Sequence, residues 1–380
     1  MLTSRERVLC AINHEEPDRV PIFFGTSSPT SMLSTAYERF KDYLGVTHPL
    51  RLLSKTFQYA QLDDDVMDRC GSDGRLISPR PPPAILRREV SETRLIDDWG
   101  VTWEQRPGVP YYEVMGVPLK DVTIYDLETY PWPDLTHPDR FVGLAEEARA
   151  MHEDTPYAVI ALGYLTTFEH IQLLRGLDQW LMDLAADPEF AHAIMRKVTD
   201  VMLAGVCEYL EVVGPYIDLL TFSDDLGTQR APLISPKMYR KMVKPYQAEL
   251  IAAIKARTKA KIFFHSCGNV YPLIGDFIEI GMDVLNPVQV SAGEMGDTAR
   301  LKREFGDRIT FCGAIDTGRV LPHGTPDDVR AEVRRRIKDL APGGGYILSA
   351  VHCIQPDVPP ENVLAMFDEA RAAGTYPIRL

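Results

Sequence analysis

The chain has 380 residues, a formal net charge of −13 and six cysteines. An acidic protein is a poor partner for nucleic acid or an anionic membrane, and no apolar run reaches the roughly 18 residues that a membrane-spanning helix needs. The polar start has no signal-peptide core and six cysteines are too few for a disulfide scaffold, so we expect a cytoplasmic protein with reduced thiols.

The N-terminal third predicts two short elements followed by an irregular stretch. Ser4 can cap a helix over residues 5–13, and a short apolar strand is predicted over residues 20–24. Residues 71–134 hold several prolines and short alternating runs, which are typical of β-strands joined by irregular loops. We interpret this stretch as a β-rich insertion within a single domain that spans residues 1–380.

From about residue 140 onward, strand-like and helical patterns alternate. The predicted strands span residues 157–162, 217–222, 261–264, 283–286, 309–312 and 346–350. The main helical patterns span residues 188–213, 235–257 and 325–340. Apolar strands that alternate with helices predict a parallel sheet in an α/β fold. With residues 20–24 and one more strand hidden near the insertion, the count approaches eight, which predicts a (β/α)8 TIM barrel. The alternative is a doubly wound sheet, but no Gly-x-Gly-x-x-Gly follows a strand.

The strongest chemical signal is His265-Ser266-Cys267, which follows a buried strand and precedes Gly268. Residues two apart in extended backbone point to the same side, so the imidazole and the thiol converge at the end of the strand. One further sulfur would complete a Cys2His zinc set with an open fourth position, as in catalytic zinc sites. Cys353 and Cys312 both follow late strands, and we favour Cys353 because Cys312 lies nearer a strand interior.

Other polar residues also stand where predicted strands end, which is where TIM barrels carry their active sites. Asp224 and Asp225 are adjacent and face opposite sides of a strand, so one of them is a candidate proton carrier or fourth ligand. Asn286 and Gln289 are candidate substrate-binding residues. His352 neighbours Cys353 and is predicted to face away from it in extended backbone.

Aromatic residues at the ends of three strands predict an apolar wall beside the site. Phe23 and Phe222 are the candidate substrate contacts, with Phe24 and Phe264 beside them. Such a wall favours an aromatic or other weakly polar ligand.

The residues also resemble a known family. The opening residues 4–8 and 16–21 look like the start of the uroporphyrinogen decarboxylase superfamily, and His265-Ser-Cys-Gly-Asn269 resembles its zinc-dependent, corrinoid-linked methyltransferase branch. The resemblance covers most of the chain and is strongest from residue 215 onward. It implies a barrel fold and zinc ligands at His265, Cys267 and Cys353. This branch usually has small residues immediately before the late cysteine, where the chain has Val351 and His352.

The resemblance implies a methyl transfer between a small-molecule donor or a thiol acceptor and a corrinoid. The chain has no Asp-x-His-x-x-Gly motif for binding a corrinoid, so we expect a partner protein to carry it. The predicted aromatic wall favours demethylation of a methyl ether. The decarboxylases have an arginine-rich stretch after the opening, whereas this chain has no arginine between Arg19 and Arg39.

Two alternatives remain open at this stage. The first is a metal-free lyase like the uroporphyrinogen decarboxylases, and the second is a non-enzymatic barrel that binds a tetrapyrrole or corrinoid. Barrels of this kind often pair, so a homodimer is also among the expectations.

Overall fold

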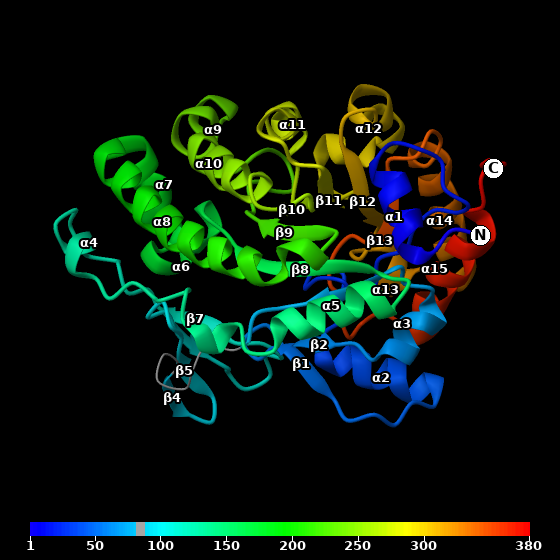
Figure 1. The fold of residues 1–380 in the computed structure, drawn as a ribbon, viewed down its shortest axis with the longest axis horizontal. Helices are drawn as coiled ribbons and strands as arrows, with labels where there is room; N and C mark the ends of the chain where they lie inside the picture. Colours follow the sequence, from blue (N-terminus) through cyan, green and yellow to red (C-terminus); the bar gives the residue numbers. More distant parts are fainter. Residues whose placement is uncertain (81–87) are drawn as a thin grey trace.

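A curved parallel sheet of seven strands forms the centre of the molecule (Figure 1). The computed structural model describes residues 1–80 and 88–380. The strands follow one another around the sheet in chain order, from β3 to β8 and on to β13, and every neighbouring pair is parallel. They are β3 (Gly74–Ile77), β8 (Ala158–Leu165), β9 (Leu219–Ser223), β10 (Lys261–His265), β11 (Val284–Val288), β12 (Thr310–Ile315) and β13 (Tyr346–Ala350).

Residues 20–24 occupy the gap between the two edge strands, β13 and β3. Ile22 forms a parallel bridge with Leu348, and Leu348 N–H donates to the Pro21 carbonyl oxygen at 2.9 Å. On the other side, Asp73 N–H donates to the Ile22 carbonyl oxygen at 2.8 Å. This extended segment therefore takes the eighth position, and β3 is the strand expected near the insertion. The fold is the predicted TIM barrel, although residues 20–24 pair with β13 and β3 by isolated hydrogen bonds and not by a regular ladder.

Helices surround the sheet, and one of them closes the end of the barrel at which the strands begin. α1 (Ser4–Ile12) places Val8 and Ile12 in the barrel interior together with Phe23 and Phe263. Its cap is Thr3 and not the predicted Ser4, because Thr3 and Glu6 satisfy each other's backbone N–H groups in a capping box. The carboxyl ends of the strands lie opposite α1, and we call that end the barrel mouth.

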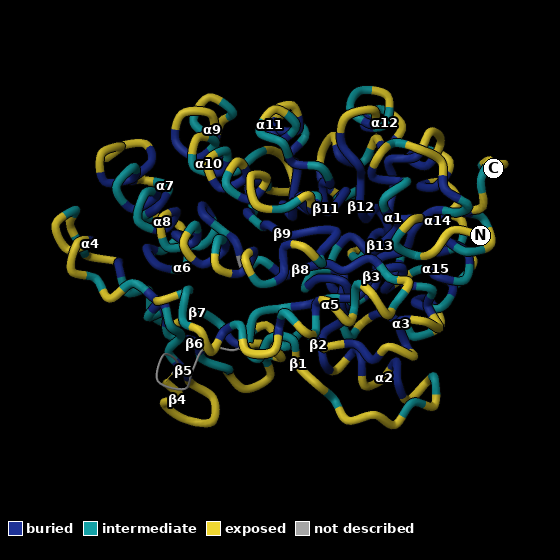
Figure 2. The backbone as a smooth tube through the Cα atoms, in the orientation of Figure 1, coloured by how far each residue is buried: buried dark blue, intermediate teal, exposed yellow. Residues whose placement is uncertain are grey.

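The remaining helices cover the outside of the barrel and the accessory segments. They are α2 (Ser34–Leu44), α3 (Asp64–Cys70), α4 (Asp126–Thr129), α5 (Leu144–Asp154), α6 (Phe168–Arg175), α7 (Leu177–Ala186), α8 (Pro188–Val213), α9 (Pro236–Met242), α10 (Lys244–Lys255), α11 (Ile274–Ile280), α12 (Thr298–Phe305), α13 (Val320–His323), α14 (Pro326–Leu340) and α15 (Pro360–Ala373). The predicted helix 235–257 is two helices, because Pro245 has no N–H to continue the hydrogen-bond ladder across Val243. Figure 2 shows buried strands at the centre and exposed positions on the outer helices.

Two small antiparallel sheets lie outside the barrel. One is the hairpin of β1 (Arg51–Ser54) and β2 (Tyr59–Gln61). The other contains β4 (Arg88–Ser91), β5 (Arg94–Ile96), β6 (Thr102–Glu104) and β7 (Glu113–Gly116), at the lower left of Figure 1. The predicted insertion 71–134 thus contains this sheet, but it also contains β3, which belongs to the barrel; residues 81–87 of it lie outside the described residues.

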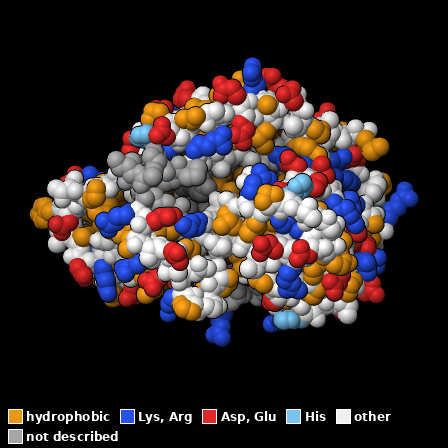
Figure 3. Space-filling model, turned by 90° about the horizontal axis from the view of Figure 1, so that it is seen from below, with side chains coloured by type: hydrophobic (Ala, Val, Ile, Leu, Met, Phe, Trp, Pro, Cys, Tyr) orange, Lys and Arg blue, Asp and Glu red, His pale blue; other side chains and the backbone are white. Residues whose placement is uncertain are grey.

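The surface carries both signs of charge. Figure 3 shows Lys and Arg side chains interspersed with Asp and Glu on the face that holds the accessory segments. Among the described helices, none is long and apolar enough to span a bilayer.

Candidate metal centre

His265 is the last residue of β10, and its ring is fixed by a neighbouring strand. In the sheet it lies in register between Ser223 on β9 and Asn286 on β11. Asn286 is fully buried; its Nδ2 donates to the Cys312 carbonyl oxygen at 3.4 Å, and its Oδ1 lies 2.6 Å from His265 Nδ1. The amide oxygen therefore accepts a hydrogen bond from the Nδ1–H group of His265. This arrangement leaves the Nε2 lone pair of His265 free for a metal.

Cys267 lies beside the free nitrogen of His265, as the spacing predicts. Its Sγ is 3.4 Å from His265 Nε2. Two side chains hold the backbone in this position: Cys267 N–H donates to Asp225 Oδ1 at 2.8 Å, and Gly268 N–H donates to Gln289 Oε1 at 2.6 Å. Gln289 is therefore positioned to support the cysteine loop.

Two glycines let this loop pack directly on the loop that follows β9. A Cβ added to Gly227 would lie 2.5 Å from the Cys267 carbonyl oxygen, and one added to Gly268 would lie 2.3 Å from the Gly227 carbonyl carbon. Gly268 also has φ of +88°, a conformation that side chains disfavour. The position of Cys267 thus depends on close backbone contact between the two loops.

His352 is the third residue that could hold a metal here, and we call the side chains of His265, Cys267 and His352 the metal group. His265, Cys267 and His352 have ligand atoms within 4.8 Å of one another, and the two imidazole centroids are 5.5 Å apart. Burial, followed by the charge of His265, lowers the pKa of His352 to about 4, so its ring is neutral and has a lone pair to offer. The expectation that His352 faces away is wrong, because β13 ends at Ala350 and the chain then bends, which breaks strand alternation.

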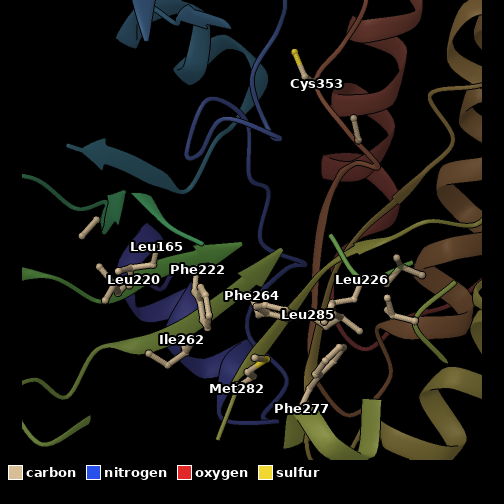
Figure 4. Close-up of a cluster of buried hydrophobic side chains, with 14 of the residues drawn as sticks. Leu165, Leu220, Phe222, Leu226, Ile262, Phe264, Phe277, Met282, Leu285 and Cys353 are labelled. Carbon is tan, nitrogen blue, oxygen red and sulfur yellow. The ribbon is translucent and has the colours of Figure 1, made fainter. Parts of the chain in front are cut away.

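The two predicted sulfur candidates lie elsewhere. Cys353 is 1% exposed, and its Sγ–H is directed at the Ile354 carbonyl oxygen, 3.9 Å away. Figure 4 shows it on the segment after β13, well apart from the Phe222 and Phe264 side chains. Cys312 faces the barrel interior, with its Sγ 3.6 Å from Ser349 Oγ, and burial raises its pKa to about 12. The group of ligand atoms within 4.8 Å of one another thus contains His352 and neither of these two cysteines.

The adjacent aspartates have different environments. Asp224 is fully buried and anchors the start of α6, where its carboxylate accepts from Thr167 N–H at 2.9 Å and Glu169 N–H at 2.8 Å. Burial raises its pKa to about 6, against the opposing effect of these hydrogen bonds. Asp225 faces the metal group, with Oδ1 3.8 Å from His265 Nε2. The structure therefore places Asp225 at the site and gives Asp224 a supporting position.

Glu169 is a site residue that sequence reasoning missed. Its carboxylate accepts a hydrogen bond from Ser223 Oγ at 3.3 Å, and Ser223 is the register neighbour of His265. Burial, followed by the negative charges of Asp225 and Asp224, raises the pKa of Glu169 to about 8. Nothing in Thr167-Phe-Glu-His170 distinguishes this glutamate from an ordinary helix-start residue, because Asp224 brings it to the site from another element.

The predicted aromatic wall does not form at the mouth. Phe222 and Phe264 contact each other with centroids 5.4 Å apart, and Phe264 packs against Phe277 of α11 (Figure 4). They point toward the helices because His265 and Ser223, the next residues on these strands, point inward. Phe23 does face inward, but it packs on Phe263 in the barrel core. These aromatic side chains therefore give no support for a methyl ether.

A cavity of about 340 Å³ adjoins the metal group. Cys267, His352 and Gln289 line it, and the remaining lining residues are uncharged: Gly227, Thr228, Gln229, Gly268, Thr317 and Val351. A small molecule in this cavity reaches the metal group directly.

The donor set fits a zinc ion. Tetrahedral ligands bound to one zinc lie about 3.5 Å apart, close to the observed separation of Cys267 Sγ from His265 Nε2. Burial, followed by the negative charges of Asp225 and Glu169, raises the pKa of Cys267. A divalent cation would offset this accumulation of negative charge and favour the thiolate.

The sequence matches known proteins over its larger, C-terminal part. The profile described as uroporphyrinogen decarboxylase matches residues 124–373. A uroporphyrinogen decarboxylase of Pelodictyon phaeoclathratiforme is 26% identical over 183 residues, covering 47% of this chain and 47% of that protein. One from Chlorobaculum tepidum is 23% identical over 185 residues, covering 48% of this chain and 49% of that protein. The chain thus spans about half the length of the curated relatives it matches.

A solved structure supports the fold over the whole chain. A methyltransferase from Methanosarcina mazei superposes with a TM-score of 0.69 at 17% identity, covering 98% of this chain and 99% of that one. At this identity the likeness establishes the shared barrel architecture.

Proposed function

The chain belongs to the uroporphyrinogen decarboxylase family, and from that premise we propose that it is a zinc-dependent methyltransferase. It moves a methyl group between a small-molecule donor or thiol acceptor and a corrinoid that a partner protein carries. The observation that carries this proposal is the group of His265, Cys267 and His352 at the barrel mouth, with ligand atoms within 4.8 Å of one another. Two imidazole nitrogens and one sulfur beside a cavity leave a fourth metal position for a small molecule.

Each residue of the site has a part in this reaction. A bound zinc would supply a Lewis acid that favours the anionic form of a substrate oxygen or sulfur. Asn286 holds His265 in the tautomer that presents Nε2. Asp225 and Gln289 fix the backbone on either side of Cys267, and the cavity admits the small molecule.

The arginines near the N-terminus argue against porphyrinogen decarboxylation. That reaction needs cationic side chains for a polycarboxylate, and Arg7 and Arg19 are the arginines nearest to residues 20–38 on their N-terminal side. Both are engaged in ion pairs with the buried Asp73, at 2.7 and 2.8 Å. Asp73 directly precedes β3, so these pairs hold α1 and the start of the first barrel segment beside that strand, and both guanidinium groups are committed to the fold.

The test is methyl transfer with and without zinc. Purified protein is loaded with zinc and supplied with a corrinoid protein and either methoxyarenes or thiols. We expect turnover with one class of substrate, its loss after chelation, and its return with zinc. Full activity after chelation would support the metal-free lyase, and corrinoid binding without turnover would support a binding protein.

The ligand set is tested in the same preparation. We expect His265→Ala and His352→Ala to lose zinc and activity, whereas Cys353→Ser, which changes the neighbouring thiol, keeps both. Loss of zinc in Cys353→Ser with retention in His352→Ala would return the third ligand to Cys353.

A further inference from the structure

Gln289 lies between the cysteine loop and the cavity. It directly follows β11, and its side chain lines the cavity together with Cys267 and His352. Its backbone carbonyl oxygen accepts a hydrogen bond from Ala292 N–H at 2.9 Å, and its side-chain Oε1 accepts one from Gly268 N–H at 2.6 Å. The residue is therefore anchored through both its backbone and its side chain.

The bond to Gly268 decides which way the Gln289 amide points. A backbone N–H needs an acceptor, so the amide oxygen and not the amide nitrogen faces Gly268. Nε2 then lies on the other side of the amide, and no described group accepts a hydrogen bond from it. Nε2 is not enclosed in the protein either, so its two N–H groups are open to the cavity that the side chain lines.

The other polar side chains around the cavity are less suited to selecting a ligand. Thr228 Oγ1 donates to the Ala231 carbonyl oxygen at 2.8 Å and accepts from two N–H groups of the same turn. Gln229 is exposed, and the hydroxyl of Thr317 can donate or accept, so it favours neither kind of ligand atom. Gln289 combines a fixed amide with free donors, and a preorganised group loses little freedom when a ligand binds.

The charges around the cavity favour an uncharged ligand. None of its lining residues is a lysine or an arginine. Arg230 and Arg319 are close to lining residues in the chain, but both are exposed and neither lines the cavity. The side chains with carboxyl groups beside the metal group are Asp225 and Glu169. A carboxylate or sulfonate in this cavity would therefore lose hydration without gaining a counterion.

We propose that Gln289 binds the substrate by donating a hydrogen bond from Nε2 to an uncharged oxygen, so that the site selects small neutral molecules that carry such an oxygen. The inference rests on the proposed function and names its substrate class, whether the molecule gives or receives the methyl group. A cavity of about 340 Å³ is near the lower end of the range of ligand pockets, roughly 300–1,000 Å³, which agrees with a small molecule.

The experiment compares two thiols of the same shape by calorimetric titration of the zinc-loaded protein. 2-Methoxyethanethiol has an ether oxygen, which can only accept, where 1-butanethiol has a methylene group. Gln289→Glu keeps an oxygen for Gly268 N–H but replaces the free donor with a second acceptor. Gln105→Glu is the matched control, because Gln105 is also half-buried but donates to the Val109 and Pro110 carbonyl oxygens outside the barrel, at 3.4 and 3.2 Å.

The quantity compared is the ratio of the two affinities, because a general effect on the zinc or on the cysteine loop alters both thiols alike. We expect the affinity for the ether thiol relative to the butyl thiol to fall about tenfold in Gln289→Glu and to stay unchanged in Gln105→Glu. We also expect 3-mercaptopropionate, which carries a carboxylate, to bind wild type more weakly than the ether thiol does.

The same affinity ratio in Gln289→Glu and wild type would overturn the contact, and so would a wild type that binds neither thiol. Tighter binding of 3-mercaptopropionate than of the ether thiol would overturn the uncharged substrate class. A wild type that distinguishes the thiols through Gln289 but transfers no methyl group supports the inference and refutes the proposed function. Methyl transfer with an unchanged ratio would do the reverse.

Discussion

Replacing Asn286 with alanine tests how the hydrogen bond behind His265 tunes this metal ligand. The change removes the oxygen that lies 2.6 Å from His265 Nδ1 and leaves that buried N–H without an acceptor. The imidazole can then move its proton to Nε2, which blocks metal binding. Loss of such a partner typically weakens metal affinity about 10- to 100-fold, or about 1.4–2.8 kcal/mol.

The assay is a competition titration with a chromophoric zinc chelator at pH 7.5. Asn362→Ala is the matched control, because Asn362 is equally buried but donates to the Leu321 and Gly324 carbonyl oxygens outside the metal centre, at 2.9 and 2.8 Å. We expect both variants to lose stability and only Asn286→Ala to lose zinc affinity. Zinc affinity of Asn286→Ala within twofold of wild type would refute the reasoning.

Three further changes probe the loops and carboxylates around the centre. Gly227→Ala places a Cβ 2.5 Å from the Cys267 carbonyl oxygen, so the chelator assay should show weaker zinc binding, whereas Gly275→Ala, with open space around it, should match wild type. Asp224→Ala removes the acceptor of four donors, two from Thr167, one from Glu169 and one from Gln247, so denaturant titration should show a loss of at least about 2 kcal/mol; an unchanged midpoint would contradict its anchoring role. Burial and the charges of Asp225 and Asp224 raise the pKa of Glu169 from 4.5 to about 8, so the folded metal-free protein holds a proton that the unfolded chain has lost. The stability of the metal-free protein should therefore fall as pH rises from 6.5 to 8, by at most about 1.4 kcal/mol per pH unit. Thermal melts of Glu169→Gln should show a smaller dependence of stability on pH than wild type. The same pH dependence in both proteins would count against the burial of this carboxyl.

The barrel could be predicted because its strands are short, apolar and separated by helices with clear starts. The seven regular strands repeat that pattern, and the helix predicted over residues 188–213 coincides with α8. The sequence predicts the closing segment at 20–24 as a strand, but its bridge to β13 joins Ile22 and Leu348, which lie more than 300 residues apart in the chain. Sequence periodicity carries no information about such contacts.

His265 and Cys267 could be found because the two-residue spacing at a strand end decides which way both side chains point. The same rule failed for His352, because it was applied beyond Ala350, where the chain is no longer extended. Strand alternation also explains why the predicted aromatic wall is not at the mouth. Because His265 points inward, Phe264, the residue before it, must point outward.

Glu169 could not be found from local patterns. Glu169 reaches the site because Asp224, on another element, anchors the start of α6. Its placement is a product of tertiary packing.

Zinc K-edge X-ray absorption of the zinc-loaded wild-type protein tests the central claim most directly, because it counts the sulfur ligands. The group of His265, Cys267 and His352 predicts one sulfur at about 2.3 Å and imidazole nitrogens at about 2.0 Å. Two sulfurs bound to the zinc would contradict this ligand set, and a protein that binds no zinc would contradict the metal centre itself.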